Sequence, residues 1–233
     1  DECYSILSED FADFIQNWKF SGSNNISTHK YIWVCWLQGK ESMPDIVKYC
    51  LKSLERNVPY NTEIKLITST NLKEYVEFPD FIYQKLKVGS LTMTHFSDLI
   101  RMALLKKYGG LWIDATVFIS SQIPKEYIEC DLYSIQNLSS KERKSNPYYG
   151  GVTSFLVGGS PKCMLFDFCL SFFIEYQRRY GSLLDVHLIN LCYRLAYDNF
   201  SEIHRYIDAI GVNNKNVQSL YKVINTPYTE EKW

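Results

Sequence analysis

The stretch that decides the fold covers residues 94–116 and reads THFSDLIRMALLKKYGGLWIDAT. Its first part predicts a helix over 94–107, capped by Thr94, because apolar residues recur at helical spacing along one stripe. Gly109-Gly110 ends this helix, since a left-handed C-cap favours glycine. The apolar run Leu111–Ile113 then predicts a buried strand that ends at Asp114.

The same alternation of strand and helix extends upstream. Tyr31–Leu37 is an apolar run without alternation, which predicts a strand buried on both faces of a sheet. A helix follows from Pro44, and Glu63–Thr68 predicts the next strand. Strands that alternate with helices indicate an α/β fold, with a Rossmann-like, mostly parallel sheet flanked by helices.

The remaining segments are less regular. The first 29 residues predict a polar helical lead-in, and the C-terminal part is mainly helical. Strands are predicted at 131–136 and 150–158, and helices from Ser160-Pro161 to about Tyr180 and from Asp185 to about Tyr197. We expect a single domain, because no repeat, low-complexity tract or linker interrupts the chain.

Composition excludes several classes of protein. The 233 residues contain 25 Lys+Arg and 26 Asp+Glu, so no excess of positive charge exists to neutralise nucleic-acid phosphates. An aromatic content of 15% excludes disorder and suits either a well-filled core or a site that stacks on bases and sugars. No apolar stretch reaches the ~20 residues that span a bilayer. The seven cysteines lack metal-ligand spacing and are expected to be free core thiols in a cytoplasmic protein.

The candidate chemistry lies in the same central stretch. Asp114 follows a buried strand, and ligands of open α/β sheets bind beyond the carboxyl ends of the strands. Asp98 and Arg101 are three residues apart on the preceding helix and therefore share a face. Such a set could hold hydroxyls, a metal and phosphates together. Taken singly, Asp98 with Arg101 could be a surface ion pair and Asp114 a turn cap; their joint placement favours function.

These residues also resemble a known family. Ser-Asp-x-x-Arg at 97–101, followed by Tyr-Gly-Gly-x-Trp-x-Asp-x-Thr at 108–116, is similar to the bacterial capsular-polysaccharide-synthesis glycosyltransferases. Those enzymes are in turn similar to the wider group of sugar transferases with an Asp-x-Asp motif. Residues 31–39 with Met43-Pro44 resemble the family's first strand and loop. The resemblance implies a GT-A-type fold, with a nucleotide-sugar-binding part over about 29–124 and an acceptor-side part over about 125–233.

The same resemblance implies an activity and a site. The activity is transfer of a hexose from a UDP-sugar, with retention, to a saccharide acceptor that can be lipid-linked. The resemblance places the uridine between first-strand aromatics and the following loop, the donor sugar and diphosphate at the helix, and the ribose and metal at the motif. The residues concerned are Trp33, Trp36, Gln38 and Gly39 for the uridine, Ser97, Asp98 and Arg101 for the sugar and diphosphate, and Asp114, Ala115 and Thr116 for the motif.

The motif departs from the wider group at its last position, where Thr116 replaces an aspartate. Mn²⁺ or Mg²⁺ is the expected ion, with Asp114, Thr116 and His187 as candidate ligands. A neutral hydroxyl is a weak ligand for a hard cation, so we expect the metal dependence to be weaker than in an Asp-x-Asp enzyme. Arg101 or a downstream lysine would then share in stabilising the charge of the leaving UDP.

Two residues downstream complete the candidate site. Asp185 joins Asp98 and Arg101 as a catalytic candidate, facing the acceptor or the reacting bond, and His187 could supply a late metal ligand. Asp185 could equally be a helix N-cap. A lone histidine near apolar residues is also more often a packed core group than a ligand.

Other functions remain open or are excluded. A dinucleotide-dependent oxidoreductase and a P-loop enzyme are disfavoured, because neither glycine-rich motif is present. The alternatives that stay open are a nucleotide-sugar-binding module without turnover and a UDP-sugar hydrolase. Basic clusters occur at Lys141–Lys144 and Arg178-Arg179. Such clusters are mostly solvated surface; the alternative is that they bind anionic lipid at the inner face of the cell membrane.

Overall fold

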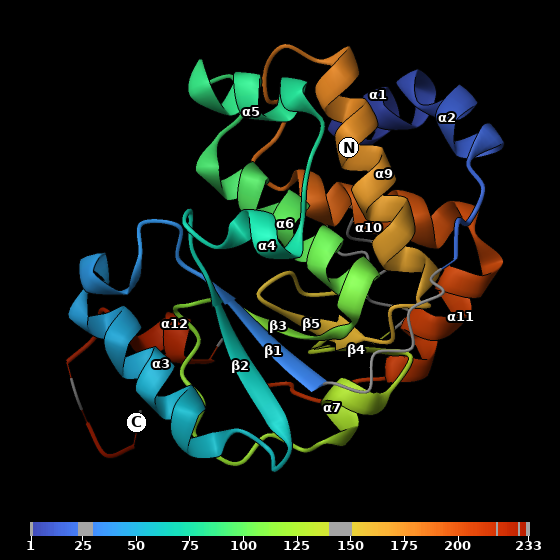
Figure 1. Ribbon diagram of the computed structural model, residues 1–233. Helices are drawn as coiled ribbons and strands as arrows, with labels where there is room; N and C mark the ends of the chain where they lie inside the picture. The colour runs from blue at the N-terminus through green and yellow to red at the C-terminus, as the bar shows by residue number, and fades with distance from the viewer. Residues whose placement is uncertain (1, 23–29, 140–150, 218, 228, 232–233) are drawn as a thin grey trace.

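The computed structural model describes residues 2–22, 30–139, 151–217, 219–227 and 229–231 (Figure 1). Its centre is a sheet with the strand order β2-β1-β3-β5-β4. The strands are β1 (Lys30–Cys35), β2 (Thr62–Ile67), β3 (Gly110–Ile113), β4 (Leu132–Ser134) and β5 (Leu156–Gly159). β1 pairs in parallel with β2 and β3, whereas β5 runs antiparallel to both β3 and β4. The α/β class and the parallel strands of the first half are confirmed, and β5 makes the sheet mixed.

Helices cover both faces of this sheet. Figure 1 shows α6, α9 and α10 on one side and α3 and α7 on the other. The longer helices are α1 (Glu2–Asp10), α3 (Asp45–Asn57), α5 (Asp80–Lys87), α6 (Met93–Tyr108), α9 (Met164–Arg179), α10 (Leu188–Asn199) and α11 (Ser201–Ile210). The shorter ones are α2 (Ala12–Asn17), η1 (Lys40–Ser42), α4 (Leu72–Tyr75), α7 (Glu126–Glu129) and α12 (Ser219–Val223). Each face of the sheet therefore has its own apolar core.

Strand β1 lies between the two cores. Trp33 packs into the core shared with α6, α9 and α10. Ile32 and Val34 point to the opposite core, which α3 and α7 close. Successive side chains of a strand alternate between faces, so a strand covered on both sides must be apolar throughout. The uninterrupted apolar run that predicted this strand is thereby explained.

The glycine pair after α6 is required by the backbone. Gly109 ends the helix at a φ of 67°, with its N–H bonded to the Leu105 carbonyl at 2.9 Å. Gly110 has a φ of 94°, and a Cβ there would lie 2.3 Å from the Tyr31 carbonyl oxygen. Both positions combine a positive φ with neighbouring atoms that leave no room for a Cβ, and only glycine tolerates this combination. The predicted helix–Gly-Gly–strand order is confirmed.

Several predicted boundaries are wrong by a few residues. The N-cap of α6 is Thr92, not Thr94, because Thr92 is the threonine with extended backbone, and its Oγ1 accepts the His95 N–H at 3.3 Å. Helix α9 begins at Met164, not at Ser160, since the chain first makes a turn in which the Cys163 N–H donates to the Ser160 carbonyl. The predicted strands at 131–136 and 150–158 shorten to β4 and β5.

The connections between strands make the strand order reverse at one end of the sheet. From β1 the chain passes through α3 to β2 on one side, and it returns through α4, α5 and α6 to β3 on the other side of β1. The carboxyl ends of β1 and β3 therefore flank a point where the strand order reverses. In open α/β sheets this is where ligands bind.

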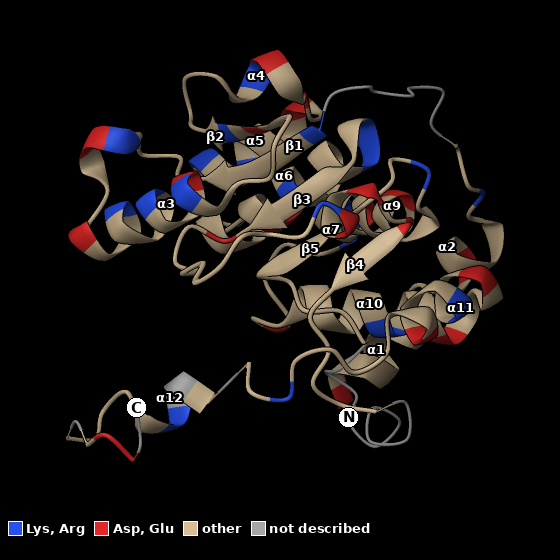
Figure 2. Cartoon of the chain, turned by 90° about the horizontal axis from the view of Figure 1, so that it is seen from below, with Lys and Arg blue, Asp and Glu red and all other residues tan. Residues whose placement is uncertain are grey.

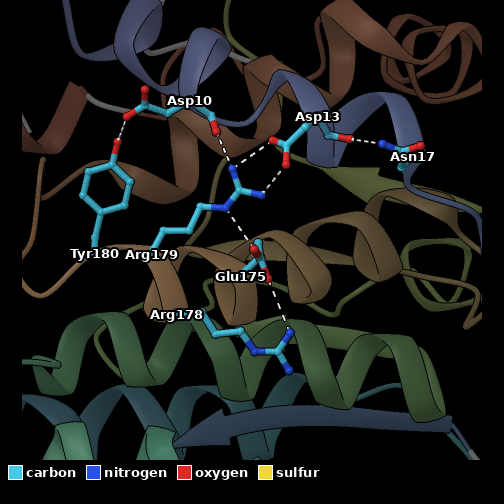
Figure 3. A network of polar contacts seen from close by, with 7 residues as sticks. All are labelled: Asp10, Asp13, Asn17, Glu175, Arg178, Arg179 and Tyr180. Atoms are coloured by element: carbon cyan, nitrogen blue, oxygen red, sulfur yellow. Dashed lines mark hydrogen bonds and ion pairs between the residues drawn. The ribbon is translucent and has the colours of Figure 1, made fainter.

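The first two helices are fastened to α9 by a polar network (Figure 3). The Arg179 guanidinium donates to both carboxylate oxygens of Asp13, at 2.9 and 3.0 Å, and to Glu175 at 2.9 Å. Arg178 also donates to Glu175, at 3.4 Å. The basic pair 178–179 is thus occupied within the fold, while the cluster at Lys141–Lys144 lies outside the described residues.

Phe11, at the junction of α1 and α2, carries much of this attachment. Its side chain is fully buried, 4.7 Å from the ring of Phe172 between centroids. We expect Phe11→Ala to lower the free energy of unfolding by about 3–5 kcal/mol, because it leaves a cavity in a packed core. Urea denaturation measures this. The control, Ile46→Ala on the exposed side of α3, should change stability by less than about 0.5 kcal/mol. An unchanged midpoint for Phe11→Ala would contradict the packing.

Two further sequence expectations can be compared with the structure. All seven cysteines lie in described residues and none is in a disulfide, as predicted; four are buried in the core and three are partly buried. Among the described residues, no helix is long and apolar enough to cross a membrane.

Candidate active site

Asp114 lies just past the carboxyl end of β3, the strand that pairs with β1. Its main chain is held on both sides: its N–H donates to the Phe155 carbonyl at 2.8 Å, and its carbonyl accepts the Val117 N–H at 2.9 Å. Its side chain is 33% exposed. The Trp112 indole donates to Asp114 Oδ1 at 2.6 Å. The carboxylate is therefore fixed in direction while one part of it faces solvent.

Arg101 bridges this carboxylate to a second one. Its Nη1 donates to Asp98 Oδ1 at 2.5 Å, and its Nη2 donates to Asp114 Oδ1 at 3.0 Å. The guanidinium carbon also lies 4.8 Å from the centre of the Trp112 ring, a cation–π contact. The predicted gathering of Asp98, Arg101 and Asp114 around the Gly-Gly stop is thus what the structure shows, because α6 leads directly into β3.

The three residues differ in how far their side chains are buried. Asp98 and Arg101 are each only 4% exposed, so in this structure neither reaches solvent. Asp114 is the member of the trio with an exposed side chain. Arg101 contacts Asp114 from the buried side and also contacts Asp98. The sequence suggested direct sugar contacts for Asp98 and Arg101; both side chains are buried in this structure, and those contacts stay a prediction.

The trio is electrostatically coupled. Burial disfavours the charged form of Arg101, yet the two carboxylates outweigh this and raise its pKa above the usual range. Burial raises the pKa of Asp98, and Arg101 opposes that rise. One cation between two carboxylates leaves the exposed side acidic when all three are ionised. A cation or a hydrogen-bond donor is the ligand chemistry that Asp114 can accept.

The residues predicted for the uridine pocket divide in the same way. Trp33 is fully buried, and its indole donates to the Gly109 carbonyl at 2.8 Å, so it is a core residue and not a pocket wall. Trp36 is half-buried on the loop after β1, and Ala115 packs against the same apolar cluster as Trp36. Gln38 is exposed and Gly39 half-buried on that loop. The loops after β1 and β3 therefore pack against the same apolar cluster at the carboxyl end of these strands.

The remaining predicted site residues are Ser97, Thr116, Asp185 and His187. Ser97 is half-buried on α6, next to Asp98, and Thr116 is exposed two residues after Asp114. Asp185 Oδ1 accepts the His187 N–H at 2.6 Å in the turn before α10, but the N-cap of this helix is His187, so the predicted cap at Asp185 is wrong. His187 is exposed at the start of that helix.

The candidate ligands fit a metal ion held jointly by protein and substrate better than one held by protein side chains alone. Within the described residues, no three His, Cys, Asp or Glu side chains converge to hold a metal ion. Asp114 offers a carboxylate, and Thr116 only an exposed hydroxyl. Mg²⁺-type cations are often held by one or two carboxylates together with substrate phosphates. Asp114 with a diphosphate would form a site of this kind.

Two residues beside the trio, Tyr193 and Cys35, were not predicted from the sequence. Tyr193 of α10 is fully buried against Arg101 and Asp98, and its hydroxyl has no hydrogen-bond partner in the described part of the structure. Cys35 is the last residue of β1. Burial raises the pKa of its thiol to about 12, while the charge of Arg101 opposes this rise and the charge of Asp114 adds to it. Both residues fit apolar stripes in the sequence, so no local signal separated them from ordinary core residues.

Comparison with known proteins gives a consistent picture. A family model described as "Capsular polysaccharide synthesis protein" matches residues 1–233. The O-glycosyltransferase braB of Annulohypoxylon truncatum is 29% identical over 102 residues, which is 40% of this chain and 24% of that protein. The match thus spans about a quarter of the relative's length. No solved structure gives a significant match to this chain.

Proposed function

The chain belongs to the capsular polysaccharide synthesis family, and from this premise we propose that it is a glycosyltransferase that moves a hexose from a UDP-sugar to a saccharide acceptor with retention of configuration. The observation that carries the proposal is the position of Asp114, a half-exposed carboxylate braced by Arg101 at the switch point of the sheet. The similarity to an O-glycosyltransferase supports the same class of reaction.

Asp114 has the central role in this proposal. Its exposed carboxylate would accept the ribose hydroxyls of the donor and, through a shared cation, hold the diphosphate. A divalent cation, where bound, supplies positive charge that stabilises the leaving UDP. The oxygen of Asp114 is already aimed by Trp112 and Arg101, so little reorganisation is needed when the donor arrives.

The loop after β1 would supply the base-binding side of the site. Trp36 is the half-buried aromatic at this edge, and Gln38 and Gly39 follow it with polar and main-chain groups. An aromatic face beside hydrogen-bonding groups is suited to a flat base such as uracil. The donor would then lie across the carboxyl ends of β1 and β3.

The test is turnover of a panel of UDP-sugars, each with and without saccharide acceptors, with Mn²⁺ or with a chelator. We expect acceptor-dependent release of UDP from one UDP-hexose and an α-linked product. Chelator should lower the rate only in part, because Thr116 replaces the usual metal-ligating aspartate. UDP release that ignores the acceptor would indicate a hydrolase, and no turnover of any UDP-sugar would refute the proposal. A β-linked product would refute retention.

A further inference from the structure

Two cavities lie along the segment that follows Asp114. The first, of about 290 Å³, is bordered by residues 117–124 on one side and by β3, β4 and β5 on the other. The second, of about 530 Å³, is bordered by residues 122–125 and by the turn before β2. Both include Gln122, Ile123 and Pro124 in their walls. The cavities therefore adjoin at these residues, and we call the two together the 117–125 groove.

The first cavity has an uncharged lining. Its wall contains no Lys, Arg, His, Asp or Glu among the described residues. Figure 2 likewise shows β4 and β5 without charged residues, in contrast to the charged outer side of α3. Placing a phosphate or another ion against such a wall would cost its hydration without a partner charge. The cavity thus favours a neutral ligand and differs from the acidic trio around Asp114.

The chemistry of this lining is mixed in a way that suits sugar rings. Gln122 and Asn214 bring amides, and Ser120 and Ser121 bring hydroxyls. Phe118 is 65% exposed at the cavity. A hexose has hydroxyl groups around its edge and an apolar C–H face, so it uses both kinds of wall.

A stacked tyrosine pair adds a flat, polar-tipped surface to the same cavity. The rings of Tyr127 and Tyr133 are 3.7 Å apart between centroids and nearly parallel. Burial, together with the hydrogen bond to Tyr127, raises the pKa of Tyr133. The pair adds two phenol hydroxyl groups to the lining.

The second cavity also has an exposed aromatic ring in its wall but, unlike the first, includes charged residues. Tyr60 lies in its wall and is 90% exposed, beside Asn61, which holds a φ of 60° in the turn. Lys30 and Glu129 form an ion pair there, which leaves Lys125 as the remaining charge of the wall. Large exposed aromatic rings are common in binding sites. One such ring stands in each cavity, with Gln122, Ile123 and Pro124 between them.

We propose that the 117–125 groove binds an oligosaccharide chain, several sugar units of which lie across both cavities. The groove begins one turn from the reacting end, because the Val117 N–H is bonded to the Asp114 carbonyl at 2.9 Å. The near end of an oligosaccharide in the groove would therefore lie close to the loop that carries Asp114. The assignment of this chain as the acceptor rests on the proposed function; the binding itself does not.

The experiment is retention on an array of immobilised oligosaccharides and their constituent monosaccharides, with the full chain as the probe. We expect oligosaccharides to be retained and single sugars not, since one sugar fills only one cavity. Phe118→Ser and Tyr60→Ser should each weaken retention about 3- to 10-fold, as expected for the loss of one aromatic contact. The matched control is Tyr49→Ser, an exposed aromatic on α3 that lines neither cavity; it should bind like the wild type.

The outcomes separate the groove from the proposed reaction. Asp114→Asn should retain oligosaccharides as the wild type does, because Asp114 lines neither cavity. Glycan retention without turnover of any UDP-sugar would support the groove and refute the transferase. Turnover with unchanged retention in the Phe118→Ser/Tyr60→Ser double variant would support the transferase and refute the groove. A wild-type chain that retains no oligosaccharide also refutes it.

Discussion

Replacing Asp114 by asparagine is expected to lower kcat/KM with the UDP-sugar by about 100-fold or more, the usual scale for losing one electrostatic contact at a reacting centre. The amide keeps an oxygen for the Trp112 indole, now 2.6 Å from Oδ1, and for Arg101. The local fold should therefore persist while the exposed negative charge is lost. Steady-state kinetics of UDP release measure the effect.

The control for this variant is Asp45→Asn. Asp45 is also an aspartate near a carboxyl-end loop, but its side chain is 88% exposed and pairs only with Lys48, at 3.5 Å. Turnover of Asp45→Asn should match the wild type. Thermal unfolding of both variants shows whether the fold is intact. A folded Asp114→Asn protein with wild-type turnover would show that Asp114 is only a turn residue.

Replacing Arg101 by methionine is expected to lower the free energy of unfolding by about 3–5 kcal/mol, the scale for breaking a buried ion pair. Arg101 and Asp98 have side chains only 4% and 6% exposed, so the Asp98 carboxylate would lose its cation while it stays buried. Turnover should fall as well, because Asp114 loses the group that orients it. Urea denaturation and steady-state kinetics measure the two effects.

Two companion variants separate stability from positioning. In the double variant Asp98→Asn/Arg101→Met, stability should partly return because no unpaired buried charge remains, while turnover should stay low. Arg101→Lys should also restore little turnover, because one ammonium cannot replace Nη1 and Nη2, which contact different carboxylates. Recovery of full turnover in the double variant would mean that Arg101 serves only to neutralise Asp98. Lys48→Met, on an exposed pair, is the control and should change stability little.

The elements around the site were largely predictable because their signals are local. The apolar run of β1 reflects a strand covered on both faces, and Gly109-Gly110 reflects a backbone that excludes other residues. The spacing of Asp98 and Arg101 on one helix, followed by Asp114 after the next strand, predicted their contact. Helix starts were less predictable, because Thr92 and Thr94 are chemically equal caps and only the backbone path selects Thr92.

The sequence by itself therefore determined the α/β alternation, the family and the trio of charged residues, since each depends on neighbours within a few turns of chain. Tertiary structure decided which members of the trio are exposed. Asp98, Arg101 and Trp33 are covered by the core that α9 and α10 complete, whereas Asp114 stays open. The 117–125 groove depends likewise on β4, β5 and Asn214, far away in the chain. Exposure is set by packing between distant segments, and for that reason no local pattern could specify it.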